Sequence, residues 1–456
     1  MILLPVHIRN INIMNILRIT LRNIQTEFPV LALLILLATG CNTQPTGKTT
    51  EIIKTDKGFS LNYNGSPYFV KGAVGWGFLD ELARSGGNSL RGSYRSLDEA
   101  NKLGLTMLVN LPMKAERDGF DYNDVNAVKE QSDRAIKIVE EYKDHPAVLM
   151  WAIGNELDHI PGDLDYNLKV WDAVNDIAGM IKKIDPNHPV MTVTGFGKLE
   201  KLKDIIERCP NLDLLGVNAY ASIVNIPEWL RKYDWNKPYI VTEWGPSGWW
   251  EVPRTETGVV IEETSTEKAE LYRERYEKVI MADSWCLGSF VFLWTSNRQE
   301  RTHTWFNMFH DSLKTQTIEA MQYVWTGSRP ENLAPRIESL TINNMKATDN
   351  VSLTPNSINN AEVVVNEPDN DIPKIEWELL PEPVEFGAYA GQGETKPAAV
   401  PDFIIQKQEG KISFRSPGDN GMNYRLFVYI YDGNGNVSVA NIPFYTGRTT
   451  NAKSVQ

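Results

Sequence analysis

Two short apolar segments of the sequence each end close to a glutamate. Residues 151–156 read Trp-Ala-Ile-Gly-Asn-Glu and residues 239–244 read Tyr-Ile-Val-Thr-Glu-Trp, which gives the candidate pair Glu156 and Glu243. Both segments are predicted to be buried strands, and in a parallel barrel the reacting groups lie where strands end. Cleavage of a glycosidic bond needs one carboxylic acid that protonates the leaving oxygen and one carboxylate that attacks. We therefore expect both side chains at one rim of a barrel, about 5 Å apart.

Polar and aromatic neighbours of these glutamates suit a sugar-binding cleft. Asn155 directly precedes Glu156, and its amide could donate a hydrogen bond to a sugar 2-hydroxyl. Sugar rings present C–H faces that stack on aromatic planes. Trp244 directly follows Glu243, and Trp294 ends the last predicted strand. We expect both indole rings to contact substrate.

Eight apolar segments, separated by helical patterns, form the part of the chain that would position the glutamates. The predicted strands are residues 68–72, 89–91, 106–110, 148–153, 190–194, 214–218, 239–242 and 289–294. Several are apolar throughout, which is typical of strands covered on both faces. No Gly-x-Gly-x-x-Gly motif is present, which disfavours a dinucleotide-binding sheet. The alternation predicts an α/β fold, a (β/α)8 TIM barrel over residues 58–328.

Beyond residue 328 the helical period disappears. Short alternating segments follow, separated by clusters of Asn, Pro and Gly. This pattern predicts an immunoglobulin-like β-sandwich over residues 329–447. Residues 448–456 are predicted to be a disordered tail.

Residues 1–40 have the pattern of a secretory signal. Arginines precede an apolar run at residues 28–38, and small residues lead from there to Cys41. The run is too short to span a bilayer, which takes about 20 residues. The ending Leu-Ala-Thr-Gly-Cys resembles the lipobox of bacterial lipoproteins. That resemblance implies lipidation of Cys41, a tether over residues 41–57 and anchoring to the outer membrane, facing the surface or the periplasm; plain secretion is the alternative.

Composition limits the possible partners. The net charge is −12, and an acidic surface repels phosphate backbones, which argues against nucleic acid. His145, His188 and His303 do not form a metal-ligand pattern, and we predict no metal and no cofactor. Cys209 and Cys286 give no disulfide framework and are predicted to be free structural thiols.

Taken together, these segments resemble the TIM barrels of glycoside hydrolase family 2 and of the larger clan of retaining β-glycosidases. The likeness covers roughly residues 66–310 and includes segments 87–91, 145–156, 218–220 and 241–245. It implies Glu156 as acid/base, Glu243 as nucleophile and net retention of configuration.

The same resemblance implies a set of residues around the cleaved sugar. Asn218 and Tyr220 lie in the segment similar to strand six of such barrels, and Trp294 stands where the clan places an aromatic floor. Arg91 and Tyr220 would keep Glu243 ionised, because a neighbouring cation lowers the pKa of a carboxyl group.

These features predict a retaining glycoside hydrolase that acts on a β-linked neutral poly- or oligosaccharide. A β-glucan is the first expectation, from the aromatic content. A transglycosylase stays open as an alternative, because an acceptor sugar can replace water in the same double displacement. A glycan-binding lipoprotein on an inactive barrel is a further alternative, which the presence of both carboxylates disfavours.

Overall fold

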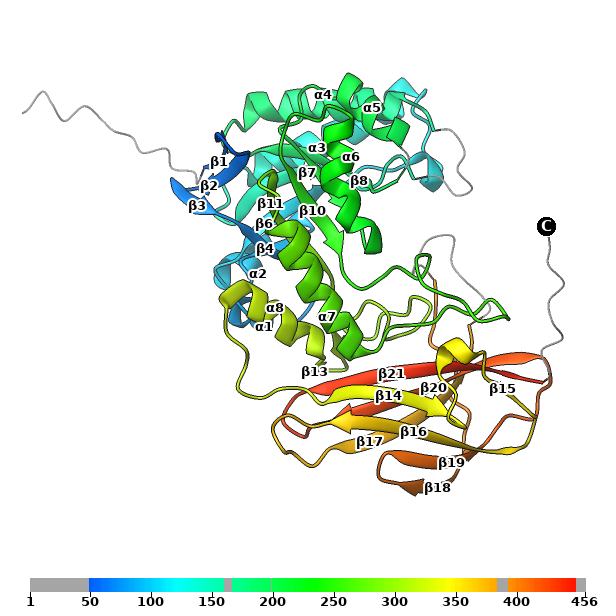
Figure 1. The fold of residues 1–456 in the computed structure, drawn as a ribbon. Helices are drawn as coiled ribbons and strands as arrows, with labels where there is room; N and C mark the ends of the chain where they lie inside the picture. The colour runs from blue at the N-terminus through cyan, green and yellow to red at the C-terminus, as the bar shows by residue number, and fades with distance from the viewer. Residues whose placement is uncertain (1–48, 160–165, 198, 384–392, 448–456) are drawn as a thin grey trace, which may run out of the picture. The chain divides into compact units, whose positions relative to one another are not determined.

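The computed structural model describes residues 49–159, 166–197, 199–383 and 393–447. Its larger domain is a closed barrel of eight parallel strands in the order β10-β11-β4-β5-β6-β7-β8-β9 (Figure 1). The strands are β4 (Val70–Gly75), β5 (Ser89–Gly92), β6 (Thr106–Leu111), β7 (Val148–Ile153), β8 (Val190–Gly195), β9 (Leu214–Asn218), β10 (Tyr239–Trp244) and β11 (Cys286–Trp294). The predicted TIM barrel is confirmed.

Helices cover the outside of this ring (Figure 1). They are α1 (Leu79–Arg84), α2 (Leu97–Lys102), α3 (Val125–Tyr142), α4 (Lys169–Ile184), α5 (Leu199–Arg208), α6 (Ile226–Lys232), α7 (Ser265–Arg275) and α8 (Gln316–Thr326). Alternate strand residues point to opposite faces. One set therefore packs against the helices, as Trp151 and Val241 do, and the other fills the barrel, as Met150 and Ile240 do.

A small antiparallel sheet lies at the start of the described chain. It consists of β1 (Thr50–Lys54), β2 (Phe59–Tyr63) and β3 (Ser66–Tyr68). Leu61 of β2 is 1% exposed and joins the cluster that fills the barrel, so this sheet covers one end of the ring.

Two expectations for this region are wrong. Residues 50–54 belong to a paired strand and not to a tether, because Thr50 donates a backbone hydrogen bond to Asn187 and Ile52 packs beside the barrel core. The first barrel strand begins at Val70 and not at residue 68, because Tyr68 pairs with Leu61 in the small sheet. The signal segment, Cys41, residues 41–48 of the tether and the tail lie outside the described residues.

The C-terminal domain is a sandwich of two four-stranded sheets, as predicted. One sheet has the order β14-β16-β19-β18 and the other β15-β21-β20-β17. Their bounds are β14 (Arg336–Ile342), β15 (Ser352–Leu353), β16 (Ile358–Asn366), β17 (Lys374–Pro381), β18 (Ile404–Gln408), β19 (Lys411–Arg415), β20 (Met422–Tyr431) and β21 (Val437–Thr446). Leu426 and Val428 face the core between the sheets, whereas Phe427 and Tyr429 form a second cluster with Leu313 of the barrel domain. Both faces of the β20 sheet are therefore buried.

The described helices include none that is both long and apolar enough to cross a membrane. Cys209 and Cys286 are buried and free, as predicted.

Candidate active site

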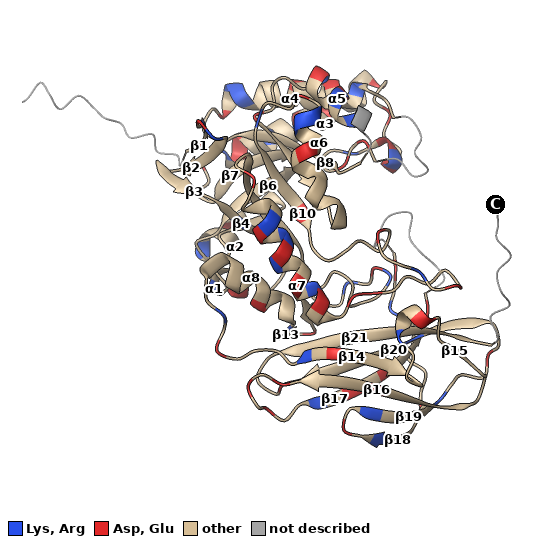
Figure 2. Ribbon diagram, in the orientation of Figure 1, with Lys and Arg blue, Asp and Glu red and all other residues tan. Residues whose placement is uncertain are grey.

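Charged residues are rare in the barrel strands, which are almost uniformly tan in Figure 2. The eight strands contain three, Lys71, Arg91 and Glu243. Lys71 donates a hydrogen bond to the Trp325 carbonyl. Arg91 is 2% exposed and its Nη1 lies 2.8 Å from Glu243 Oε1. A buried guanidinium needs an anion beside it, so the two remaining charges form a pair inside the ring.

The remaining hydrogen bonds of Arg91 reach polar groups on other parts of the barrel. Nη1 also donates to the Thr242 carbonyl at 2.9 Å, and Nη2 donates to Asn155 Oδ1 at 2.6 Å. Nε donates to Asn110 Oδ1 at 3.3 Å. Since all three nitrogen atoms of the Arg91 guanidinium donate hydrogen bonds, Arg91 fixes the positions of the groups around it.

Asn218, the last residue of β9, connects this network to Glu156. The Thr242 hydroxyl donates to Asn218 Oδ1 at 2.8 Å, which turns the amide nitrogen the other way. That nitrogen donates to Glu156 Oε1 at 2.7 Å and to Asn155 Oδ1 at 3.1 Å. The structure therefore brings Glu156 and Glu243 to one polar network.

A tight turn after β7 presents Glu156. Gly154 has φ 72° and Glu156 has φ 47°, so both are left-handed. A side chain in that region costs about 1 kcal/mol or more, which the surroundings must offset. The Glu156 amide donates to the Val193 carbonyl at 2.8 Å. The strained residue is thus held against β8.

Arg117 holds the other side of this turn. Its Nη2 donates to the Asn155 carbonyl at 3.1 Å, and its Nη1 donates to the carbonyls of Glu156 and His159. Arg117 lies in a short 3-10 helix, Glu116–Asp118, which follows β6. No strand-end or motif signal in the sequence marks this residue.

Both glutamates line one pocket of about 780 Å³. Its polar and aromatic walls include Trp76, Arg117, Asn155, Asn218, Tyr220, Trp249, Trp250, Arg298 and Glu300. Trp76 is 62% exposed and Trp250 is 49% exposed, so flat apolar rings remain available at its edges. A space of this size with aromatic faces and several hydroxyl-binding groups fits a sugar.

Burial decides the ionisation of Glu243. Burial raises the pKa of this carboxyl, the Arg91 guanidinium opposes the rise, and nearby Glu156 adds to it. The net shift of this pKa is upward, and the expectation that Arg91 lowers it below the ordinary value is wrong. Tyr220 donates to Glu243 Oε2 at 3.4 Å, and burial raises the pKa of its own phenol well above 10. The phenol therefore keeps its proton and acts as a donor.

Trp244 and Trp294 do not line the pocket, so the expectation that they contact substrate is wrong for this structure. Both are fully buried; Trp244 packs on Tyr272 and Tyr276, and Trp294 donates to the Phe78 carbonyl. Side chains alternate along a regular strand, but β10 has a register shift between Val241 and Trp244, so that Glu243 faces the pocket while Val241 and Trp244 both pack against the helices. On β11 a register shift lies between Phe292 and Trp294, and there Phe292 and Leu293 both line the pocket while Trp294 points outward.

Arg298 and Glu300 lie in the pocket wall after β11. In the sequence, residues 297–301 are polar, which fits the lining of sugar subsites and a solvated loop equally well. Among the described residues, no group of three or more His, Cys, Asp or Glu side chains could hold a metal ion.

Part of the barrel is similar to a known protein family. Residues 95–249 match the model described as "Glycosyl hydrolases family 2, TIM barrel domain". No curated protein matches the sequence.

Similar solved structures include Bacteroides uniformis β-glucuronidase, with 15% identity, a TM-score of 0.47, and coverage of 87% of this chain and 48% of that one. A family 2 member from Bacteroides cellulosilyticus DSM 14838 has 14% identity, a TM-score of 0.40, and coverage of 88% and 48%. Parabacteroides merdae β-glucuronidase has 13% identity, a TM-score of 0.45, and coverage of 89% and 52%. The chain spans about half the length of each.

The matched segment runs from η2 (Tyr94–Ser96) to the loop after β10, and it contains both glutamates. It lies within a closed ring of eight parallel strands. Over residues 95–249 the barrel domain of this chain is therefore similar to the TIM barrel domain of glycosyl hydrolases family 2.

Proposed function

We propose that this barrel is a retaining glycoside hydrolase that cleaves β-linked neutral poly- or oligosaccharides. One observation carries the proposal: Glu156 and Glu243 line the same pocket and are connected through Asn218 and Arg91. Two carboxylic acid side chains at one sugar are the groups that a retaining glycosidase uses, one as acid and the other as nucleophile.

In the proposed reaction, Glu243 attacks the anomeric carbon while Glu156 transfers its proton to the leaving oxygen. The C–O bond to the leaving group breaks and a glycosyl ester on Glu243 forms. Glu156 then takes a proton from water, the water oxygen bonds to the anomeric carbon, and the ester bond breaks. Arg91 offsets the negative charge of Glu243 before attack and after release, and Tyr220 donates to the same carboxylate.

The charges of the pocket support a neutral sugar. Arg298 faces Glu300, with Nη1 3.0 Å from Oε2, and Arg117 donates to three backbone carbonyls. The pocket thus contains both signs of charge, each already engaged. A β-glucan is our first choice, because the exposed rings of Trp76 and Trp250 offer flat faces for successive sugars.

The test is a screen of the purified protein against defined β-glucans, galactans, mannans and xylans, with product analysis by mass spectrometry and NMR. We expect products of retained anomeric configuration from at least one neutral β-glycan. Added acceptor sugars separate hydrolysis from transglycosylation, since a transglycosylase forms longer products. An inverted product would contradict the nucleophile assignment, and no cleavage of any substrate would contradict the proposal.

We also propose that Cys41 carries lipid and anchors the protein to the outer membrane. The proposal is supported by the sequence at residues 28–41. Metabolic labelling with a fatty acid tests it: label should appear in the wild-type protein and be lost in Cys41→Ser, which should leave the membrane fraction. Equal labelling of the two proteins would contradict lipidation at Cys41.

A further inference from the structure

A charged pair lies in the pocket wall formed by the segment after β11. Glu300 is 3% exposed, and Arg298 Nη1 lies 3.0 Å from its Oε2. Burial raises the pKa of Glu300 to about 7, although Arg298 opposes the rise. Placing two such groups in a buried wall costs desolvation energy, and apolar residues of similar size would avoid that cost. Their presence beside the pocket therefore points to recognition of a polar ligand.

This pair lies close to the nucleophile. The Arg298 guanidinium is 5.5 Å from the ring centroid of Phe292, and that ring is 5.9 Å from the ring of Tyr220. The Tyr220 hydroxyl is 3.4 Å from Glu243. Arg298, Glu300 and Glu243 line the same pocket, so a sugar in that pocket can face the nucleophile and the charged pair together.

A buried carboxylate holds the segment from behind. Glu262 is 6% exposed and accepts from Thr302 and Thr304 of the segment, at 2.7 and 2.8 Å. Lys268 donates to it at 2.6 Å, and Asn441 of the sandwich domain donates at 2.7 Å. Burial alone would raise the pKa of Glu262, but Lys268 and the other donors lower it on balance. Glu262 therefore remains an acceptor that joins the wall to β21.

One further contact closes the segment on itself, and two more join it to its surroundings. Glu300 exchanges two backbone hydrogen bonds with Thr302, at 3.1 and 2.7 Å. The amide of Arg301 donates to Glu394 at 2.6 Å, and His303 Nε2 lies 2.7 Å from the Tyr429 hydroxyl. Glu394 and Tyr429 belong to the sandwich domain, so this domain reaches the wall at three points.

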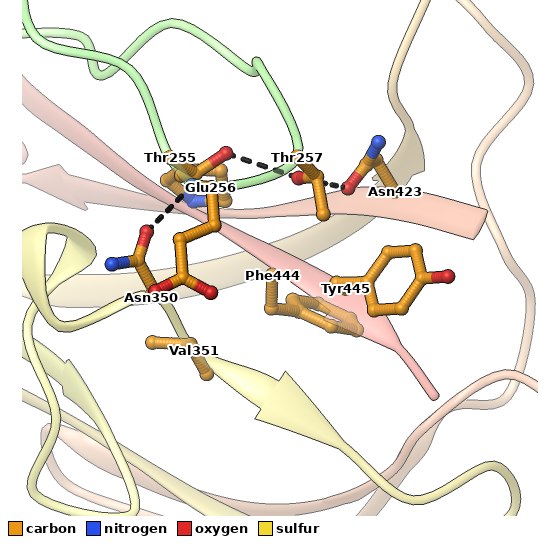
Figure 3. Close-up of a pocket in the computed structure, with 9 residues that line it drawn as sticks. Thr255, Glu256, Thr257, Asn350, Val351, Asn423, Phe444 and Tyr445 are labelled. Carbon is orange, nitrogen blue, oxygen red and sulfur yellow. Dashed lines mark hydrogen bonds between the residues drawn. The ribbon is translucent and has the colours of Figure 1, made fainter. Parts of the chain in front are cut away.

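The neighbouring loop after β10 is attached in the same way. Figure 3 shows Glu256 donating through its amide to Asn350 and Thr257 donating through its hydroxyl to Asn423, each at 2.8 Å. Farther along this loop, the Val260 carbonyl accepts a hydrogen bond at 2.9 Å from Arg425 of the sandwich domain. Arg425 is 1% exposed. Both loops beside the pocket thus depend on residues from the sandwich domain.

We propose that Arg298 and Glu300 select the sugar bound beside Glu243 by hydrogen bonding to its ring hydroxyls. The sandwich domain holds them in place through Asn441, Glu394 and Tyr429. The inference rests on the proposed glycosidase function and deepens it. Arg298 and Glu300 are specificity-determining residues, whereas Asn441 and Tyr429 are positioning residues.

The first experiment compares sugar selectivity. Wild type, Glu300→Gln and Arg298→Gln are assayed on 4-nitrophenyl β-glucoside, β-galactoside, β-mannoside and β-xyloside. The galactoside and the mannoside each differ from the glucoside in the configuration of one hydroxyl group, and the xyloside lacks the hydroxymethyl group, so we expect at least a roughly tenfold change in the ratios of kcat/KM. Glu256→Gln, which removes a charge outside the catalytic pocket, should keep the wild-type ratios. Unchanged ratios in both wall variants would overturn the selection role.

The second experiment tests the support without relying on activity. Hydrogen exchange of residues 298–304 is measured in Asn441→Ala, Tyr429→Phe and the control Ser413→Ala. Ser413 lies on β19 of the other sheet and donates to Asn360 at 2.7 Å, so the control also loses one hydrogen bond. We expect faster exchange of residues 298–304 in Asn441→Ala and Tyr429→Phe only. These two variants should also show the change in sugar selectivity that Glu300→Gln shows. Tyr429→Phe keeps the test decisive if Asn441→Ala unfolds.

The outcomes separate the inference from the proposed function. If the wild-type protein cleaves glycosides but the wall and support variants keep its sugar selectivity and its exchange rates, the inference is overturned and the proposed function stands. A wild-type protein inactive on every glycoside and glycan would overturn the function and the selection role with it. The exchange measurement would still decide whether the sandwich domain holds the segment.

Discussion

Arg91 and Glu243 form an ion pair across the inside of the barrel, with 2.8 Å between Nη1 and Oε1. Arg91 comes from β5 and Glu243 from β10, which are separated by β11 and β4 in the closed ring. The pair therefore forms only when the barrel closes. Its electrostatic effect is a balance in which burial raises the pKa of Glu243 and Arg91 limits the rise.

Replacing Arg91 with Met should move the acid limb of the activity profile to higher pH. Without the guanidinium the pKa of Glu243 rises further, so a higher pH is needed to ionise the nucleophile. We expect a shift of at least about one pH unit in kcat/KM, with lower turnover. The matched control is Arg84→Met on α1, whose side chain is 63% exposed. An acid limb identical to wild type would contradict the role of Arg91.

Glu243→Gln should lower kcat by at least about 10³-fold, because the amide cannot form the glycosyl ester. The hydrogen bond from Arg91 can still reach the amide oxygen, so the melting temperature should stay close to that of wild type. Glu228→Gln, on the exposed side of α6, should retain full activity. Kinetics and thermal unfolding of the three proteins check both points, and a fully active Glu243→Gln would remove it as nucleophile.

Glu156→Ala should lose activity most strongly on substrates with poor leaving groups, which need protonation. On 2,4-dinitrophenyl glycosides the ester on Glu243 should still form, and azide should release it as the β-glycosyl azide. We expect azide to raise turnover of this variant and not that of wild type. Product NMR identifies the azide, and an α-configured azide would place the nucleophile elsewhere.

His303 should make stability depend on pH between about 6.5 and 3. It is 2% exposed, and burial lowers its pKa to about 3 from an ordinary value of 6.5. The unfolded chain therefore binds this proton at a higher pH than the folded one. Its contribution to stability is complete above pH 6.5 and is lost as the pH falls toward 3.

His303→Gln should make this acid-side loss of unfolding free energy shallower, by up to about 1.4 kcal/mol per pH unit. Urea titrations at pH 7, 6, 5 and 4 measure the slope. His159→Gln, which removes an exposed imidazole, should keep the wild-type slope. An unchanged slope in His303→Gln would contradict a neutral buried imidazole at this position.

The order of strands and the positions of both glutamates are readable in the sequence, because burial on two faces produces continuous apolar runs. Strand β7 covers residues Val148–Ile153 and β9 covers Leu214–Asn218, both with the predicted bounds. A residue at a strand end is also a local feature, so Glu156 and Glu243 can be found without knowing the ring. The resemblance to family 2 barrels depends on the same local segments.

The tertiary structure alone decides which side chains meet. Trp244 is adjacent to Glu243 in sequence but faces the helices, whereas Arg91 lies 152 residues away and pairs with it. Asn441 reaches Glu262 across 179 residues and supports a wall that the sequence marks only as polar. These contacts, and the direction of the pKa shift of Glu243, depend on register shifts within strands, on barrel closure and on burial, which local sequence patterns do not specify.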